Sequence, residues 1–262
     1  MNRLALSRTD ERTIHALRTR KQRTQQGLFL AEGVRVSEDA IDAGLVLRLA
    51  VVSSSLEDND RGAALLRRLE EVTQVHTVSE GVMRHLASTE TPQGVLLVAE
   101  MPVVSPAALV VPTAAVILVL DAVQDPGNFG TLVRTADAFA AAAVIALPGT
   151  VDPWNPKSVR AAAGSSFRVP LVQMTTTAAA DWLRQHGFTV LAADAAGTPI
   201  AEVTLPPRVA LVVGNEGAGV RADTVAAADS RVAVPMRGRA DSLNVAVAAG
   251  ILLDRITTRL RS

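Results

Sequence analysis

Three stretches of the chain place amides, hydroxyls and charged side chains directly after apolar runs. They span residues 120–139, 211–220 and 234–253, and the second reads LVVGNEGAGV. A carboxylate repels phosphate, so Glu216 in that glycine-rich turn argues against a phosphate-binding loop. The turn therefore either binds a ligand without phosphate or binds no ligand.

Neither nucleophilic nor metal chemistry fits these stretches. The chain has no cysteine, which excludes a thiol nucleophile and cysteine metal ligands. The histidines are His15, His76, His85 and His186. A serine nucleophile in the three stretches would need a histidine as its base, and all four histidines lie outside these stretches. They are also far apart and lack metal-ligand spacing, so we expect no bound metal.

The three stretches follow strands of a predicted βα alternation. Strand-like runs lie at 114–121, 143–147, 169–173, 188–193, 209–213 and 232–236. Helical stretches lie at 128–140, 155–163, 176–186, 219–228 and 242–260. This alternation predicts a parallel α/β sheet with helices on both faces. Ligands bind beyond the carboxyl ends of such strands, where the three stretches begin.

A smaller α/β domain is predicted in the first half of the chain. Residues 27–100 contain about four strand-like runs with helical segments between them. Residues 101–113 carry three prolines among small apolar residues and are typical of an extended linker. We therefore expect a basic N-terminal extension (1–26), a smaller domain (27–100), the linker (101–113) and a larger domain (114–262).

Positive charge is concentrated at the N-terminus, although the formal net charge of the whole chain is zero. Residues 1–30 hold seven basic and two acidic side chains, and 9–20 is typical of a short basic helix. This asymmetry indicates contact with a polyanion such as RNA, and a solvated helix face is the alternative. The candidate RNA-binding residues are Arg12, Arg18, Arg20, Lys21 and Arg23.

Composition and hydropathy indicate an ordinary globular protein. The chain is 48% hydrophobic and 20% charged. Its N-terminus lacks the apolar segment of a signal peptide, and the apolar run 114–120 is too short to span a bilayer. We therefore expect a cytoplasmic protein without membrane contact.

The three stretches resemble, in order and spacing, the signature motifs of the SpoU/TrmH family of RNA ribose 2′-O-methyltransferases, in the SPOUT superfamily. They read LDAVQDPGNFGTLVRTADAF, LVVGNEGAGV and VPMRGRADSLNVAVAAGILL, and AAAGSSFRVP (161–170) is similar to the family's stretch between the first two. The resemblance covers about 115–262 strongly. Residues 27–100 more weakly resemble the family's substrate-binding domain, which is related to the L30e ribosomal-protein fold.

The resemblance implies S-adenosylmethionine-dependent 2′-O-methylation of a ribose in rRNA, with 23S rRNA expected. A tRNA methyltransferase, or an rRNA methyltransferase that confers antibiotic resistance, is the alternative. It also implies a C-terminal trefoil knot that holds the cofactor, and a homodimer through the methyltransferase domain 114–262. A non-catalytic RNA-binding protein and a nucleotide-binding enzyme are the competing classes. The latter lacks the expected glycine-rich motifs.

The resemblance also assigns residues to the site. Cofactor contacts are implied for Gly214, Asn215, Val234, Met236, Ser242 and Leu243. Catalytic roles are implied for Asn128, Arg134, Glu216, Ser242 and Asn244. Gly214 would let the backbone approach the cofactor. Considered alone, Asn128 and Ser242 are also typical of helix N-caps, and Val234 and Leu243 of core positions.

Arg134 matches the arginine proposed as catalytic in the family. A guanidinium stays protonated at neutral pH and cannot act as a base. We therefore favour a role in which Arg134 holds the 3′-phosphate and stabilises negative charge on the ribose oxygen. A deprotonated arginine in a dry site is the alternative. Outside the motifs, Trp154 could stack a base, although packing within its own loop is the simpler interpretation.

Overall fold

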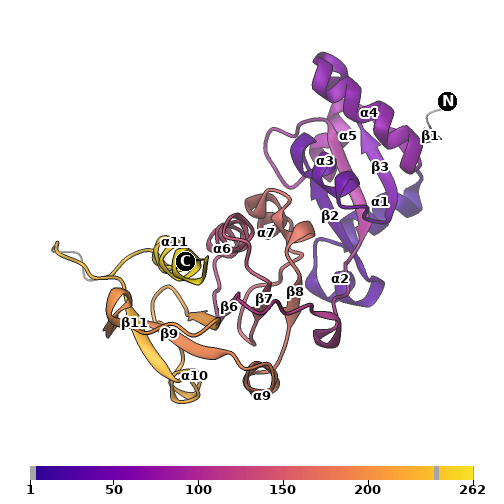
Figure 1. Cartoon of the computed structure of the whole chain (residues 1–262). Helices are drawn as coiled ribbons and strands as arrows, with labels where there is room; N and C mark the ends of the chain where they lie inside the picture. The colour runs from indigo at the N-terminus through magenta and orange to yellow at the C-terminus, as the bar shows by residue number, and fades with distance from the viewer. Residues whose placement is uncertain (1–3, 239–241, 262) are drawn as a thin grey trace. The chain divides into compact units, whose positions relative to one another are not determined.

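The structure is a computed structural model that describes residues 4–238 and 242–261. The chain forms two compact units, coloured along the sequence in Figure 1. The first contains the residues up to Pro102 together with Asp152–Phe167. The second contains Val103–Val151 and the residues from Arg168 onward.

The first unit is built on a mixed five-stranded sheet in the order β1-β4-β3-β5-β2. Its strands are β1 (Leu4–Ala5), β2 (Leu28–Glu32), β3 (Leu47–Val52), β4 (Val75–Thr77) and β5 (Val95–Glu100). β5 runs antiparallel to its neighbours β2 and β3, whereas the β1–β4 and β4–β3 pairs are parallel. The structure thus adds the short strand β1 to the four strands predicted.

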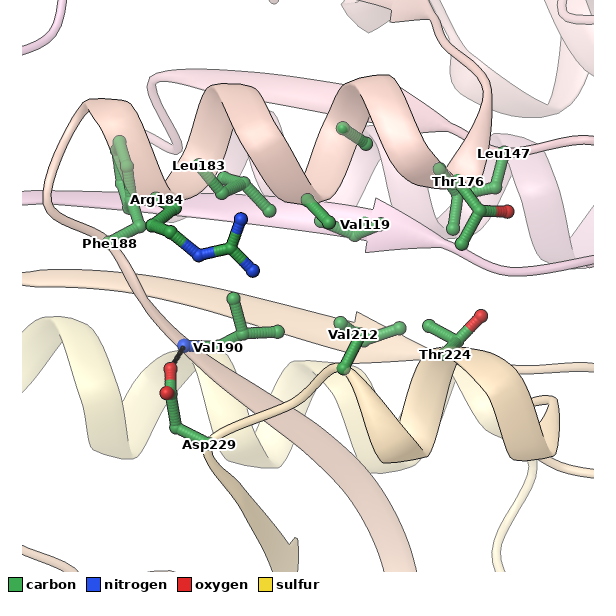
Figure 2. A pocket seen from close by; sticks show the side chains of 13 residues that line it. Val119, Leu147, Thr176, Leu183, Arg184, Phe188, Val190, Val212, Thr224 and Asp229 are labelled. Carbon is green, nitrogen blue, oxygen red and sulfur yellow. Dashed lines mark hydrogen bonds between the residues drawn. The ribbon is translucent and has the colours of Figure 1, made fainter.

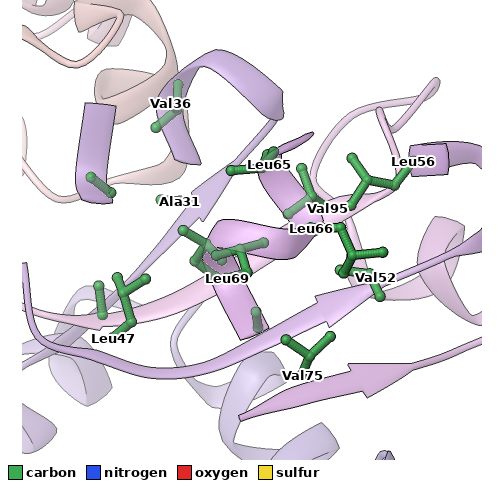
Figure 3. Close-up of a cluster of buried hydrophobic side chains, with 14 of the residues drawn as sticks. Ala31, Val36, Leu47, Val52, Leu56, Leu65, Leu66, Leu69, Val75 and Val95 are labelled. Atoms are coloured by element: carbon green, nitrogen blue, oxygen red, sulfur yellow. The ribbon is translucent and has the colours of Figure 1, made fainter. Parts of the chain in front are cut away.

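Helices cover both faces of this sheet. They are α1 (Arg8–Ala16), α2 (Arg20–Gln26), α3 (Val34–Asp42), α4 (Asp60–Val72), α5 (Glu80–Leu86) and α7 (Pro156–Ala162), with a 3-10 turn at Ser54–Asp58. Successive residues of a strand point to opposite faces. Ala31 therefore packs in one core with Leu69 of α4 (Figure 3), and Leu30 packs in another with Ile14 of α1 and Met83 of α5.

The N-terminal segment that was predicted as an extension packs into the first unit. Its predicted single helix at 9–20 is two helices, α1 and α2. The hydroxyl of Thr19 accepts a hydrogen bond from the backbone of Gln22 and caps the second helix. Ile14 and Leu17 are fully buried. Residues 8–26 therefore contribute to the core rather than standing outside it.

Residues 152–167, which the sequence placed in the larger domain, pack with the first unit. Trp154 is 8% exposed, and its ring lies 4.7 Å from that of Phe29, centroid to centroid. Val159 of α7 lies in the same core cluster. Trp154 is thus a core residue, and the idea that it stacks a base is wrong because its ring is buried.

The second unit is a six-stranded parallel sheet in the order β11-β9-β10-β6-β7-β8, which confirms the predicted parallel arrangement. Its strands are β6 (Ala115–Leu120), β7 (Ala143–Ala146), β8 (Leu171–Gln173), β9 (Thr189–Pro199), β10 (Arg208–Val213) and β11 (Ser230–Ala233). All six residues of β6 are buried, as expected for a strand covered on both faces.

Helices lie on both faces of the parallel sheet, as predicted. They are α6 (Pro126–Ala138), α9 (Thr176–Gln185), α10 (Ala222–Ala226) and α11 (Val245–Arg261), with a 3-10 turn at Ile200–Glu202. The short helix α8 (Ser165–Arg168) begins within residues 152–167, which pack with the first unit. Figure 1 shows α6 and α11 on one face and α9 and α10 on the other. Among the described residues, no helix combines the length and apolar character that crossing a bilayer requires.

The segment predicted as a linker is largely exposed. Val103 and Val110 are 94% and 85% exposed, and a 3-10 turn at Pro106–Ala108 interrupts the extended chain. These two side chains contribute nothing to a core, whereas the half-buried Leu109 and Val111 pack against the core of the second unit. The exposure of the segment agrees with its proline-rich composition.

Candidate active site

Helix α6 begins so that Asn128 keeps its side chain for other contacts. Asp125 is the N-cap, and its carboxylate accepts a hydrogen bond of 2.7 Å from the backbone N–H of Asn128. Pro126 follows at the first helical position, where a missing N–H costs nothing. The interpretation of Asn128 as the N-cap is therefore wrong.

The Asn128 amide joins the three motifs by hydrogen bonds. Its Nδ2 donates to Glu216 Oε1 at 3.0 Å, and its Oδ1 accepts from Asn244 Nδ2 at 3.0 Å. The three residues come from α6, from the turn after β10 and from the start of α11. The structure thus brings together three of the five residues predicted to be catalytic.

Glu216 is surrounded by N–H donors rather than by cations. Besides Asn128, its carboxylate accepts from the backbone of Gln124 at 3.4 Å and of Asp125 at 3.2 Å, and from Asn215 Nδ2 at 3.4 Å. Burial raises the pKa of Glu216, but the hydrogen bonds from Asn128 and from backbone N–H groups outweigh it and hold the pKa below its usual value. Glu216 is therefore ionised, and it holds the turn in place through these hydrogen bonds.

The turn after β10 is closed by its own backbone and by Asn215. Backbone hydrogen bonds of 2.9 Å run both ways between Asn215 and Gly219, and Asn215 Oδ1 accepts from Gly217 and Ala218 at 3.0 Å each. A Cβ on Gly214 would lie 2.1 Å from the carbonyl carbon of Gly219. Close packing of the turn therefore already requires glycine at 214, whatever ligand approaches it.

A buried ion pair that sequence reasoning missed ties this turn to β6. Asp121 is fully buried at the end of that strand. It accepts hydrogen bonds from the backbone of Arg221 at 2.9 Å and from Arg221 Nε at 2.6 Å. A carboxylate directly after an apolar strand was the available signal. Asn215 Nδ2 adds a third tie by donating to the carbonyl of Ala122 at 3.1 Å.

A cavity of about 370 Å³ lies at the carboxyl ends of β10 and β11, beside the middle of β9. All six residues predicted to contact a cofactor line it, together with Glu216: Gly214, Asn215, Val234, Met236, Ser242 and Leu243. Apolar walls come from side chains such as Val232 and Leu252. This volume lies in the range of small-molecule sites, and the mixture of apolar walls and a few polar groups is typical of them.

The N-cap of helix α11 is Asn244 rather than Ser242. Asn244 Oδ1 accepts hydrogen bonds from the backbone of Ala246 at 2.9 Å and of Val247 at 3.4 Å, which is N-cap geometry. The interpretation of Ser242 as an N-cap is therefore wrong. Ser242 is exposed, and it lines the cavity.

Arg134 lies on α6 and is exposed. It makes no hydrogen bond or ion pair with any residue that the structure describes. It is also not among the described residues that line the cavity of about 370 Å³. Its five N–H donors are therefore available to an anionic group that approaches α6.

The five basic residues predicted to bind RNA differ in their surroundings. Arg12, Arg20 and Lys21 are exposed and have no ion-pair partner among the described residues. Arg18 is exposed as well, but its guanidinium donates to the carbonyls at the end of α5, at 2.6 Å for His85. The first three are thus the most available to phosphate.

Arg23 is a structural residue, so its assignment to RNA binding is corrected. It is 2% exposed and forms an ion pair with Asp152, to which its Nε donates at 2.9 Å. Its Nη1 also donates to the carbonyl of Leu17 at 2.8 Å. A guanidinium enclosed in this way cannot reach a phosphate without breaking the core of the first unit.

Two histidines that are distant in sequence meet in the first unit. The rings of His15 and His85 lie 4.8 Å apart, and Glu11 lies 4.0 Å from His15 Nε2. One ligand atom from each of these three residues lies within 4.8 Å of the others. Burial and the nearby Arg18 cation lower the pKa of His15, and a metal cation would meet the same repulsion. The absence of a bound metal stays a prediction.

A second cavity, of about 130 Å³, lies beside α9 and α10 on the other face of the parallel sheet. Figure 2 shows apolar side chains such as Val119 and Leu183 along its middle. Its polar groups lie at the ends, where Asp229 already accepts a hydrogen bond of 2.7 Å from the backbone of Val190. It contains none of the residues predicted to be functional, so the larger cavity is the candidate site.

The sequence profile of the SpoU rRNA Methylase family matches residues 115–254, more than half of the chain. The chain belongs to the SpoU family. A second profile, that of the MRM3-like substrate binding domain, matches residues 12–97. Residues of the second and third motifs line the large cavity, and Asn128 of the first motif is hydrogen-bonded to Glu216 and Asn244.

Two SpoU relatives match nearly the whole chain. The 23S rRNA (guanosine(2553)-2′-O)-methyltransferase RlmP of Bacillus subtilis (strain 168) is 40% identical over 239 residues, which cover 90% of this chain and 91% of that protein. The 23S rRNA (uridine(2479)-2′-O)-methyltransferase of Streptomyces viridochromogenes is 31% identical over 261 residues, covering 93% and 88%.

A solved SpoU structure shares the fold over almost the full length. The methyltransferase AviRb from Streptomyces viridochromogenes, in complex with the cofactor AdoMet, matches with a TM-score of 0.89 at 29% identity. The match covers 98% of this chain and 99% of that one. Both units therefore belong to the shared architecture.

Proposed function

We propose that this protein transfers a methyl group from S-adenosylmethionine to a ribose 2′-hydroxyl of 23S rRNA. One observation carries the proposal. Side chains from the motif turns after β10 and β11 line one cavity, and hydrogen bonds through Asn128 connect that wall to α6 and α11. The relatives named above act on 23S rRNA, one at a guanosine and one at a uridine.

The cavity suits S-adenosylmethionine by its chemistry. Apolar walls from Val234, Met236 and Leu243 fit an adenine ring, and the amide of Asn215 and the hydroxyl of Ser242 can bond to polar groups. The ionised Glu216 favours a cationic sulfonium over a phosphate. When bound, the cofactor supplies an activated methyl group, so the protein has chiefly to align the acceptor oxygen.

Around the reacting oxygen we assign separate tasks to three residues. Arg134 holds the 3′-phosphate beside the acceptor ribose and stabilises negative charge on the 2′-oxygen. Asn128 and Asn244, joined at 3.0 Å, hold the wall next to it in one orientation. Ser242 is a neutral hydrogen-bonding group for a hydroxyl.

The first unit selects the RNA in this proposal, and the second transfers the methyl group. Support comes from the match of residues 12–97 to a substrate binding domain and from the exposed Arg12, Arg20 and Lys21. In this proposal the predicted RNA-binding range 27–100 is extended by the helices of residues 8–26, residues 152–167 supply packing to it, and 114–262 stays the range for catalysis. We place the protein in the cytoplasm, where ribosomal RNA is found.

The proposal includes a trefoil knot around the cofactor site and a homodimer through the second unit. Exposed apolar side chains on α11 support the dimer, because Val247 is 51% and Ile251 is 36% exposed one helical turn apart. Replacing both with aspartate should give monomers in light scattering. A dimer that persists unchanged would place its interface elsewhere.

The test is methyl transfer from labelled S-adenosylmethionine to total RNA from cells that lack this protein. We expect label in the large ribosomal RNA, in a dinucleotide that resists alkali, because alkaline cleavage requires a free 2′-hydroxyl. Label in tRNA would replace the substrate with the alternative class. Cofactor binding without transfer to RNA or to ribosomal particles would contradict the enzymatic assignment.

A further inference from the structure

The pairing of β9 with β11 contains a large bulge beside the cavity. Arg231 pairs with Ala192, but the next residue, Val232, pairs with Thr198. Residues 193–197 of β9 are therefore left out of the ladder, opposite a single peptide bond of β11. Bulges of this kind occur next to active sites, where they re-aim side chains.

The bulge is held tightly in place. A Cβ on Gly197 would lie 2.7 Å from the backbone of Arg231 and Val232, so the bulge packs directly against the β11 backbone. Within it, Asp194 Oδ1 accepts from the backbone of Ala196 at 2.9 Å, and Asp194 Oδ2 accepts from Arg231 Nη1 at 3.2 Å. Both carboxylate oxygens are therefore oriented before any ligand arrives.

The bulge places Asp194 in the wall of the large cavity, together with Ala193 and Ala195. Among the described residues that line this cavity, Asp194 and Glu216 are the acidic ones. Glu216 is occupied by four N–H donors, which come from the turn, from the two residues before α6 and from α6 itself. Asp194 has one bond to each oxygen, so each retains a lone pair for a further donor.

We propose that Asp194 binds the ribose hydroxyls of S-adenosylmethionine, which makes it a further cofactor-binding residue. The inference rests on the proposed function. A vicinal diol offers two donors, and a carboxylate has two oxygens to accept them; in dinucleotide-binding α/β folds a carboxylate likewise bonds a ribose hydroxyl. The alternative donor is the ammonium group of the methionine tail. Asp194 fits it less well because Arg231 already neutralises the carboxylate.

The experiment measures binding of three ligands by calorimetry to the full chain and to Asp194→Ala. The ligands are S-adenosylhomocysteine, 5′-methylthioadenosine, which lacks the amino-acid tail, and the 2′,3′-dideoxy form of 5′-methylthioadenosine. We expect the variant to bind the first two about 10- to 100-fold more weakly, the effect of losing a hydrogen bond to a charged group. We expect little difference for the dideoxy ligand. S-adenosylhomocysteine offers both candidate donors, 5′-methylthioadenosine lacks the ammonium group, and its dideoxy form lacks the diol as well.

Three results of this binding comparison would overturn the inference. Weaker binding of S-adenosylhomocysteine alone would place the ammonium group at Asp194. Equal losses for the dideoxy ligand would show that no ribose contact exists. Unchanged affinities would remove Asp194 from the site.

Two variants separate a direct contact from collapse of the bulge. Arg231→Gln breaks the ion pair but leaves the carboxylate, so affinity should change by no more than about threefold. A loss equal to that of Asp194→Ala would instead show that the pair acts only by supporting the bulge. Asp181→Ala removes an exposed carboxylate that is likewise paired with an arginine, Arg184, and should bind as the wild type does.

The wild-type chain distinguishes failure of this inference from failure of the proposed function. If it binds S-adenosylhomocysteine and methylates RNA while Asp194→Ala matches it in affinity, only the inference is overturned. If the wild type binds none of the three ligands, the proposed function and the inference are both overturned.

Discussion

At the scale of single residues, Glu216 sets the orientation of two amides. A carboxylate has no hydrogen to donate, so Asn128 must present its NH₂ group to Glu216 and its carbonyl oxygen to Asn244. Asn244 must then present its own NH₂ group, which leaves its oxygen for the N–H groups of α11. The direction of the whole chain of hydrogen bonds follows from one charge.

Arg134→Ala tests the electrostatic role of the arginine. We expect transfer to fall about 10²- to 10³-fold, as when an oxyanion donor is removed, with cofactor affinity nearly unchanged because Arg134 lies outside the cavity wall. Single-turnover rates and calorimetry measure the two effects. Arg134→Lys should keep part of the rate through its charge, and Arg184→Ala is the surface control. Near-normal transfer by Arg134→Ala would remove the residue from the mechanism.

Glu32 provides a prediction about pH and stability in the first unit. Burial raises its pKa, but hydrogen bonds from Thr89 and Ser88 and the charge of Arg160 hold the pKa below its usual value. Because the folded-state pKa is depressed, the contribution of Glu32 is present above the unfolded value of 4.5 and is lost as the pH falls. Its side chain is 5% exposed, so the effect should be measurable.

Glu32→Gln should therefore lower the free energy of unfolding by about 1–3 kcal/mol near neutral pH. The difference from wild type should shrink at about pH 4. Urea unfolding can be followed through the fluorescence of Trp154, with Trp182 replaced by phenylalanine in all proteins, because Trp154 reports the first unit. The control is Glu90→Gln, because Glu90 is exposed and follows directly after Ser88 and Thr89. A difference that does not depend on pH would contradict the charge-based explanation.

At the scale of elements, α11 begins on a residue that also serves the site. Asn244 accepts from the first backbone N–H groups of the helix and donates to Asn128. Capping and positioning therefore use different atoms of one amide. The start of α11 and the orientation of the Asn128 amide are therefore coupled through Asn244.

Two substitutions at Asn244 separate these tasks. Asn244→Ala should lower the free energy of unfolding by about 1 kcal/mol, the usual cost of losing an N-cap, and should also slow transfer. Asn244→Asp keeps the cap, since aspartate is an equally good one, but it cannot donate to Asn128. We expect normal stability with slow transfer, measured by urea unfolding and single-turnover assays. Full activity of Asn244→Asp would show that the bond to Asn128 is dispensable.

At the scale of the whole molecule, the basic side chains of the N-terminus divide into exposed ones and one that is enclosed in the core. Arg12, Arg20 and Lys21 are exposed, whereas Arg23 is enclosed with Asp152. A charge count of the segment cannot make this distinction. It follows from the packing of α1 and α2 into the first unit.

Replacing Arg12, Arg20 and Lys21 together with alanine should weaken RNA binding and flatten its salt dependence. Each lost phosphate contact lowers the slope of log K against log salt by about 0.7, so three contacts should lower it by about two. The control replaces Arg48, Arg61 and Arg68, which are already paired with carboxylates in the same unit. It removes equal charge, and an equal change in slope would show that net charge alone is responsible.

Arg23→Ala should instead destabilise the fold. It leaves the carboxylate of Asp152 largely buried without its partner, at a cost of about 3–5 kcal/mol. Thermal or urea unfolding measures this loss. RNA affinity per folded molecule should stay close to that of the wild type. Normal stability combined with a reduced salt slope would return Arg23 to the RNA-binding surface.

The sequence by itself determined the order and kind of most elements in the second unit. Continuous apolar runs predicted β6 and β10, and the polar stretches after the strands predicted where a ligand site would lie. The strand predictions agree with the structure because a strand that is covered on both faces needs a continuous local run of apolar residues. The six cofactor positions taken from the motifs accordingly line one cavity.

Only the tertiary structure decided what each side chain contacts over long distances. It enclosed Arg23 with Asp152, buried Trp154 against Phe29, and turned Asp194 into the cavity through a bulge that no local pattern marks. The physical reason is that burial and pairing depend on segments far apart in the chain. An arginine of a basic segment stays exposed or becomes a core residue, depending on whether folding places a buried carboxylate beside it.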